Sequence, residues 1–126
     1  MVSALSSSER SALDAAIRQA EQTSRAEFSV FVGPVEGDAA AFARRLHRAM
    51  TAPTISVLVM VDPDARVVEV VTGSTVRRTL SDAQVELGMA TMLASFRDGE
   101  LVEGLRRGLA YLAEHARPSL VRHAAE

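Results

Sequence analysis

The residues best suited to bind a ligand lie in the link from Thr72 to Thr79, between an expected strand and an expected helix. Two arginines stand near the end of this link, and a helix that starts at Ser81 would add free backbone N–H groups for an anion. Guanidinium groups form strong, charge-assisted hydrogen bonds with phosphate and carboxylate. The sequence therefore predicts a site for a small anion, with a solvated surface link as the alternative, because the glycines of a phosphate-binding loop are missing. The predicted contact residues are Thr72, Gly73, Ser74, Arg77 and Arg78.

A second set of side chains could hold a hard cation such as calcium or magnesium, which prefers oxygen ligands. The carboxylates that could gather near one end of the sheet are Asp62, Asp64, Glu69, Asp82 and Glu86. Asp82 would be the metal ligand in that case. Turn chemistry accounts equally well for Asp62 and Asp64, and the electrostatics of a first helical turn account for Asp82. The main expectation is therefore no cofactor, with calcium or magnesium as the alternative.

A further basic cluster surrounds His47, where Arg44 and Arg48 share one face of an expected helix with Arg45 beside them. This cluster could contact an anion or a partner, although a solvated helix face is the simpler interpretation. Metal-ligand spacing is absent among the three histidines, which are His47, His115 and His123. The chain has no cysteine, so we expect no histidine metal site.

The elements that must position these residues alternate between helix and strand. A capping box at residues 6–9 predicts the start of the first helix, and β-branched and aromatic residues over Glu27–Val32 predict a strand. Asp38 is expected to cap a second helix that Pro53 ends. The apolar run Thr54–Val61 predicts a central strand that is covered on both faces.

The second half of the chain continues this pattern. A turn over residues 62–65 joins the central strand to an antiparallel strand at Val67–Val71. A second capping box at residues 81–84 predicts another helix, which Gly99 ends in the left-handed conformation. Asp98 is expected to cap the last helix, and the chain after residue 116 is expected to be frayed.

Composition limits the classes of function. The 126 residues suffice for one domain, and net charge is −2 with both signs mixed along the chain, so no nucleic-acid partner is expected. The N-terminus does not resemble a signal peptide. The longest apolar stretch, Val57–Val61, is far shorter than the ~20 residues that a transmembrane helix needs. We therefore expect a soluble, cytoplasmic protein without a transmembrane segment.

Several segments in this order resemble the TPM domain family, closest to a soluble actinobacterial branch of unknown function. They are LSSSERSALDAAIRQAE, FSVFVG, VLVMVDPDARVVEVVTG, LSDAQ and FRDGELVEGLRRGLAYLAEH, within residues 5–116. The resemblance implies an α/β fold, a three-layer α/β/α sandwich with a small mixed sheet. Some plant members are linked to acid phosphatase activity and divalent cations. This chain departs from the usual glycine-rich pattern at residues 52–55 and 72–78.

These observations predict a single domain over residues 1–126, with a core at 5–116 and a frayed tail at 117–126. The expected function is a non-catalytic interaction or regulatory module that binds a protein partner or a small anion. The alternative is a divalent-cation-dependent, phosphatase-like hydrolase, which only the family resemblance supports. A third possibility is a component of a membrane-associated complex that has no anchor of its own.

Overall fold

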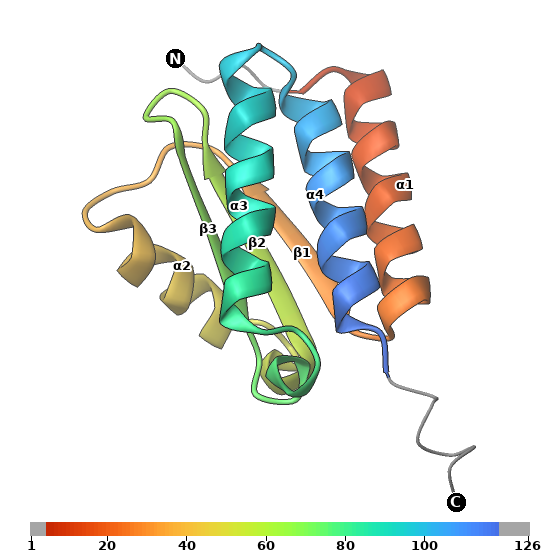
Figure 1. Cartoon of the computed structure of the whole chain (residues 1–126). Helices are drawn as coiled ribbons and strands as arrows, with labels where there is room; N and C mark the ends of the chain where they lie inside the picture. Colours follow the sequence, from red (N-terminus) through yellow and green to blue (C-terminus); the bar gives the residue numbers. More distant parts are fainter. Residues whose placement is uncertain (1–4, 119–126) are drawn as a thin grey trace, which may run out of the picture.

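The computed structural model describes residues 5–118 (Figure 1). Within them four helices and one mixed sheet confirm the α/β class. The elements are α1 (Ser7–Ser24), β1 (Glu27–Val32), α2 (Ala39–Arg48), β2 (Ser56–Asp62), β3 (Val67–Thr72), α3 (Asp82–Arg97) and α4 (Leu101–Ala116), with short 3₁₀ turns η1 (Pro53–Ile55) and η2 (Val76–Arg78). His123 and the expected frayed tail beyond Pro118 lie outside the described residues.

The sheet has the order β1-β2-β3, with β2 parallel to β1 and antiparallel to β3. All seven residues of β2 are buried, which confirms the prediction of a central strand covered on both faces. Its start is later than predicted, because Thr54 and Ile55 belong to η1. The pairing of Val57 with Thr72 brings the end of β3 next to the beginning of β2.

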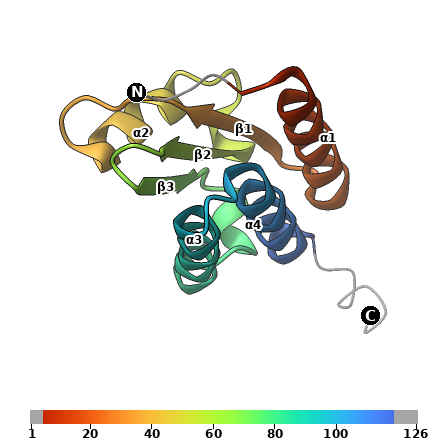
Figure 2. The same ribbon diagram turned by 90° about the horizontal axis from the view of Figure 1, so that it is seen from above.

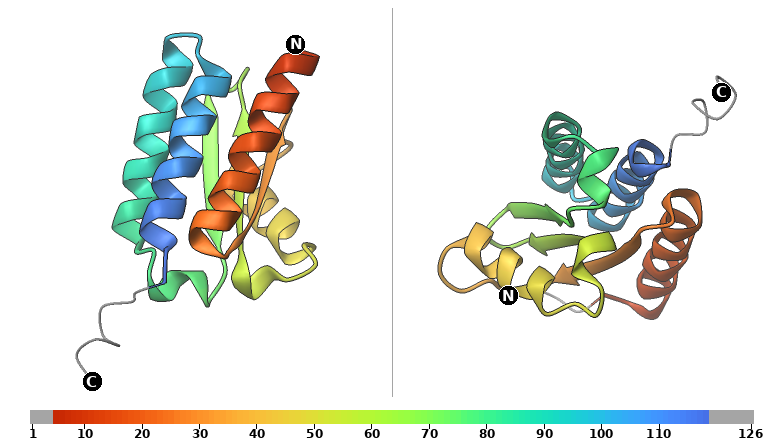
Figure 3. Two further views of the ribbon diagram at one scale, coloured as in Figure 1. Left: turned by 90° about the vertical axis from the view of Figure 1, so that its right-hand side faces the viewer. Right: turned by 90° about the horizontal axis from the view of Figure 1, so that it is seen from below.

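Apolar side chains of β2 alternate between two core clusters. Val57, Val59 and Val61 pack into the larger cluster with residues of α1, α3 and α4, whereas Leu58 and Met60 pack with residues of α2. Figure 2 shows α2 on one side of the sheet and α3 and α4 on the other. α4 lies between α1 and α3 and packs against both (Figure 3). No helix within residues 5–118 is long and apolar enough to span a membrane.

Both predicted capping boxes are present. The Ser6 hydroxyl accepts from the Glu9 N–H at 3.1 Å, and the Glu9 carboxylate accepts from the Ser6 N–H at 2.8 Å. Ser81 and Gln84 make the equivalent pair of bonds at 3.2 and 2.9 Å. These bonds satisfy backbone donors that a helix start leaves without partners, so local sequence fixes where α1 and α3 begin.

Two predicted helix ends differ from the structure. α2 ends at Arg48 with Ala49 as its C-cap, and Pro53 instead begins η1, where proline suits a first helical position. Asp98 does not cap α4, because the N-cap position falls on Glu100, which makes no side-chain cap bond. Gly99 has φ +78°, as predicted for the end of α3.

Candidate functional site

The site predicted from the link after β3 lies in an open cavity of about 320 Å³, which we call the arginine pocket. Four of the five predicted contact residues line it: Thr72, Gly73, Ser74 and Arg77. The remaining lining residues come from α2, η1 and β3, and they are Arg44, His47, Arg48, Pro53, Thr54 and Val71. The fold therefore joins two basic segments that the sequence presents separately.

Close backbone contact between the link and η1 forms one wall of this pocket. The Gly73 N–H donates to the Ser56 carbonyl at 2.9 Å, and the Thr75 N–H donates to the Thr54 carbonyl at 2.9 Å. A Cβ atom at Gly73 would lie 2.1 Å from the Pro53 carbonyl oxygen and 2.3 Å from that of Thr54. Only glycine permits this approach, so its first role is to let the link cross η1.

His47 anchors the end of α2 to the Ser56 carbonyl, which is also the acceptor for Gly73. Its side chain is buried, and Nε2 lies 3.0 Å from the Ser56 carbonyl oxygen, which also accepts the Gly73 N–H. A carbonyl oxygen can only accept, so Nε2 must carry the proton and donate. Helix α2 is thereby held against the start of β2, and Arg44 and Arg48 are presented at the rim of the pocket.

The cations of the arginine pocket have no ion-pair partner within residues 5–118. None of the described lining residues is Asp or Glu, and no ion pair in that range involves Arg44, Arg48 or Arg77. The Arg77 guanidinium donates to the Thr72 carbonyl and its backbone N–H donates to the Gly73 carbonyl at 3.1 Å. These bonds hold Arg77 near the pocket and leave several of its five N–H donors available.

Arg78, the fifth predicted contact residue, lies elsewhere. It lines a different cavity, together with Arg25, Ile55 and Thr79. Consecutive residues of the 3₁₀ turn η2 thus present their side chains to two different cavities. A third cavity, of about 540 Å³ between α1 and α4, is lined largely by alanines, and its lining includes the carboxylate of Glu114 beside Arg106 and Arg107.

The possible gathering of five carboxylates at one end of the sheet, which the sequence left as an alternative to turn chemistry, does not occur. Asp62 pairs with Val67 in the β2–β3 register, whereas Thr72 pairs with Val57, so Asp62 and the link after β3 lie at opposite ends of the sheet. The buried Asp62 carboxylate accepts the N–H groups of Val35 and Ala65 at 3.0 and 3.2 Å. It therefore stabilises the turns at that end, as its turn chemistry suggested.

Within residues 5–118 no group of three or more His, Asp or Glu side chains could hold a metal ion. Asp82 is exposed in the first turn of α3. His115 does not line the arginine pocket; its Nδ1 lies 3.1 Å from the Gln84 side-chain nitrogen, and its ring lies against Tyr111. The metal-binding role of Asp82 consequently stays a prediction from the sequence alone.

Three residues of α2 line the arginine pocket but were not among the predicted contact residues: Arg44, His47 and Arg48. They were expected on a solvated face, and both arginines are indeed exposed, but they also line a pocket with Arg77. One local signal was available, because α2 contains no carboxylate that could neutralise them. Proximity to Arg77 depends on the β2–β3 pairing and has no local signal.

Comparisons with known proteins identify a family of unknown function. The model described as Domain of unknown function (DUF5130) matches residues 2–113. Two uncharacterized proteins of Mycobacterium tuberculosis strains are 33% identical over 107 residues, which cover 85% of this chain. The chain spans 64% of the length of these curated relatives.

Three solution structures are similar in fold. BA42 protein from the psychrophilic bacterium Bizionia argentinensis has TM-score 0.78 and 21% identity, covering 92% of this chain and 83% of BA42. The N-terminal domain of a P. gingivalis protein has TM-score 0.73 and 23% identity, covering 91% and 82%. The N-terminal domain of a Corynebacterium glutamicum protein has TM-score 0.69 and 16% identity, covering 89% and 71%. These identities establish similarity of fold alone.

The family match corrects the assignment made from the order of the sequence segments. That order reflects the order of helices and strands, which proteins of one fold share without belonging to one family. The assignment to the TPM family is wrong, and the phosphatase and cation roles that it implied lose their support. The match to residues 2–113 shows that the chain belongs to the DUF5130 family, a domain of unknown function.

Proposed function

We propose that this chain is a non-catalytic binding module whose arginine pocket takes a small anion with two or more negative charges, such as a phosphoryl group. The observation that carries the proposal is the convergence of Arg44, Arg48 and Arg77 on one cavity, which no carboxylate among the described residues lines. Guanidinium groups suit phosphate because they donate two parallel hydrogen bonds. The pocket also offers the hydroxyl-bearing residues Thr54 and Ser74.

The distribution of charge between the two ends of the molecule supports the same function. Links at the pocket end, residues 25–26, 49–55 and 73–81, contain three arginines and no carboxylate. Links at the opposite end, residues 33–38, 63–66 and 98–100, contain five carboxylates and one arginine. Figure 1 shows how the alternating directions of the elements separate these links. A basic end would steer anions toward the pocket.

The scaffold around the pocket suits binding without a large rearrangement. We propose that the helices and the sheet form a three-layer α/β/α sandwich, supported by the two core clusters on opposite faces of β2. Gly73 and His47 both bond to the Ser56 carbonyl, which links two sides of the pocket to a fully buried strand residue. The backbone segments that carry the arginines are therefore already in place, so less conformational entropy is lost on binding.

Titration of the ¹⁵N-labelled chain with inorganic phosphate tests the proposal. At constant ionic strength, phosphate should shift the amide signals of Thr54, Gly73, Ser74 and Thr75, whereas chloride should not. The double variant Arg44→Gln, Arg48→Gln should weaken phosphate binding by about tenfold or more, because it removes two charge-assisted partners.

Arg45→Gln is the matched control, because the Arg45 guanidinium lies 5.6 Å from the centre of the Phe42 ring and does not line the pocket. It should bind phosphate like the wild type. Equal weakening by Arg45→Gln and by Arg44→Gln alone, each of which removes one charge, would show that phosphate responds only to overall charge. Shifts confined to other surfaces would contradict the proposed site.

A further inference from the structure

A second ligand site is suggested by the cavity that Arg78 lines. It has a volume of about 500 Å³ and lies beside the C-terminal ends of α1 and α4. We call it the amphipathic cavity, because one part of its lining is apolar and another is basic. Its apolar lining residues are Ala26, Ile55, Val76, Ala116 and Pro118. Cavities of this size accommodate small organic molecules.

Most of the hydroxyl donors in this cavity are already used by the protein. The Ser24 hydroxyl donates to the Ala20 carbonyl at 2.8 Å, and the Thr79 hydroxyl donates to the Ala116 carbonyl at 3.0 Å. A hydroxyl group has one hydrogen, so neither side chain can donate to a ligand without losing its present bond. The polar donors left for a ligand are mainly the guanidinium groups of Arg25 and Arg78.

Within residues 5–118 these two arginines are electrostatically uncompensated. None of the described residues that line the amphipathic cavity is acidic, and neither Arg25 nor Arg78 has a side-chain hydrogen bond or ion pair there. The amphipathic cavity places two cations beside an apolar wall. The arginine pocket differs, because Thr54, Ser74 and His47 line it together with the arginines. The lining therefore fits a ligand that has an anionic group and an apolar body.

We infer that the amphipathic cavity binds a free carboxylate that carries a short aliphatic chain. The carboxylate accepts hydrogen bonds from Arg78 and Arg25, and the chain lies against the wall that contains Ile55 and Val76. Charge-assisted bonds fix the anionic end, and removal of the chain from water adds affinity with each methylene group. This site is separate from the arginine pocket, so the inference does not depend on the proposed function.

Three probes test whether both halves of the ligand are recognised by the full chain: octanoate, octanol with the same chain and no charge, and acetate with the charge and no long chain. Octanoate should shift the amide signals of Ala26, Val76, Arg78 and Ala116. Octanol should bind about tenfold more weakly, because it lacks the charge-assisted bonds. Acetate should cause no comparable shifts.

Two single variants then assign the site. Arg78→Gln should weaken octanoate binding by about tenfold and leave octanol binding and the melting temperature unchanged, because the Arg78 side chain is exposed. Arg44→Gln, at the arginine pocket, should leave octanoate binding unchanged. Equal binding of octanoate to wild type and Arg78→Gln, octanoate shifts that map to the arginine pocket, or no shifts with octanoate would each overturn the inference.

Discussion

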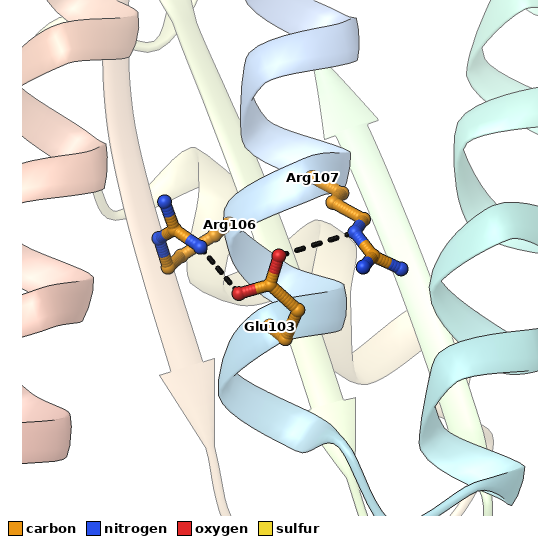
Figure 4. A network of polar contacts seen from close by, with 3 residues as sticks. All are labelled: Glu103, Arg106 and Arg107. Atoms are coloured by element: carbon orange, nitrogen blue, oxygen red, sulfur yellow. Dashed lines mark hydrogen bonds and ion pairs between the residues drawn. The ribbon is translucent and has the colours of Figure 1, made fainter.

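Arginines occupy two different electrostatic settings on this molecule. On α4, Glu103 pairs with Arg106 and Arg107, the latter at 3.1 Å, as Figure 4 shows. In the arginine pocket, Arg44 and Arg48 have no ion pair within residues 5–118. The same residue type is neutralised by its own helix in one region and left without an acidic partner in the other.

Arginines that form ion pairs within their own helix belong to the solvated surface, whereas arginines without an acidic partner are available to bind a ligand. Pairs three or four residues apart on a helix form wherever the sequence supplies both charges, and they contribute little to stability. α2 supplies only cations near its end, and the fold then adds Arg77 from a distant link. A ligand anion would supply the missing countercharge, which is the physical basis of the proposed function.

The largest effect is expected from Gly73→Ala, which would disrupt the wall of the arginine pocket. The added Cβ would lie 2.1 Å from the Pro53 carbonyl oxygen, and backbone cannot move aside as a flexible side chain can. We expect a loss of about 3 kcal/mol in the free energy of unfolding and loss of phosphate binding. Urea denaturation measures the first and NMR titration the second.

Gly88→Ala is the control for this substitution. Its Cβ would lie 3.1 Å from Cδ2 of Leu112, the end of a flexible side chain at the α3–α4 contact, so a loss of at most about 1 kcal/mol is expected. Phosphate binding should persist in this variant. Similar losses for Gly73→Ala and Gly88→Ala would mean that the link moves away from η1 at little cost.

The next effect concerns His47, which positions the two arginines of α2. His47→Ala removes the bond to the Ser56 carbonyl and should cost about 2 kcal/mol, as well as weakening phosphate binding. His47→Gln retains an N–H donor and should recover part of both losses. If His47→Gln restores stability but not binding, the ring itself contacts the anion and our account of His47 is incomplete.

Local features of the fold were predictable from the sequence. Serine-based capping boxes placed the starts of α1 and α3, because each box uses residues only three positions apart. The apolar run ending at Val61 predicted a buried central strand. Pro53 was misinterpreted as a helix end, since proline suits both the region after a helix and the first position of a 3₁₀ turn.

The arginine pocket could be predicted only in part, because its members come from distant segments. Gly73 and Arg77 were recognisable from the link itself, whereas their proximity to Arg48 requires the antiparallel pairing of β2 and β3. The same pairing sends Asp62 to the opposite end of the sheet, which the predicted turn over residues 62–65 already implied and a cluster of Asp62 with Asp82 contradicts. The separation of basic and acidic links between the two ends of the molecule also depends on how distant segments pack, so local sequence does not show it.

A smaller effect tests whether uncompensated arginines alone suffice for binding. Glu103→Gln removes both ion pairs on α4 and should reduce the free energy of unfolding by about 0.5 kcal/mol, a loss that high salt should diminish. The variant leaves Arg106 and Arg107 unpaired, but the cavity that they line between α1 and α4 also has Glu114 in its lining. Phosphate should therefore still bind only at the arginine pocket, and new amide shifts on α4 would show that a lining without carboxylates is unnecessary.

Arg44→Gln should have the smallest effect on stability of these variants, although Arg44 contributes strongly to phosphate binding. Arg44 and Arg48 lie one helical turn apart with no acidic partner, and like charges at this spacing destabilise a helix by about 0.3 kcal/mol. Arg44→Gln should therefore raise the free energy of unfolding slightly at low ionic strength. Salt screens this repulsion, so added sodium chloride should stabilise the wild type relative to Arg44→Gln, the opposite of its effect relative to Glu103→Gln. Urea denaturation at low and high salt measures both slopes. Loss of stability in Arg44→Gln at low salt would show that the protein itself compensates Arg44, and the contrast between the two regions would then disappear.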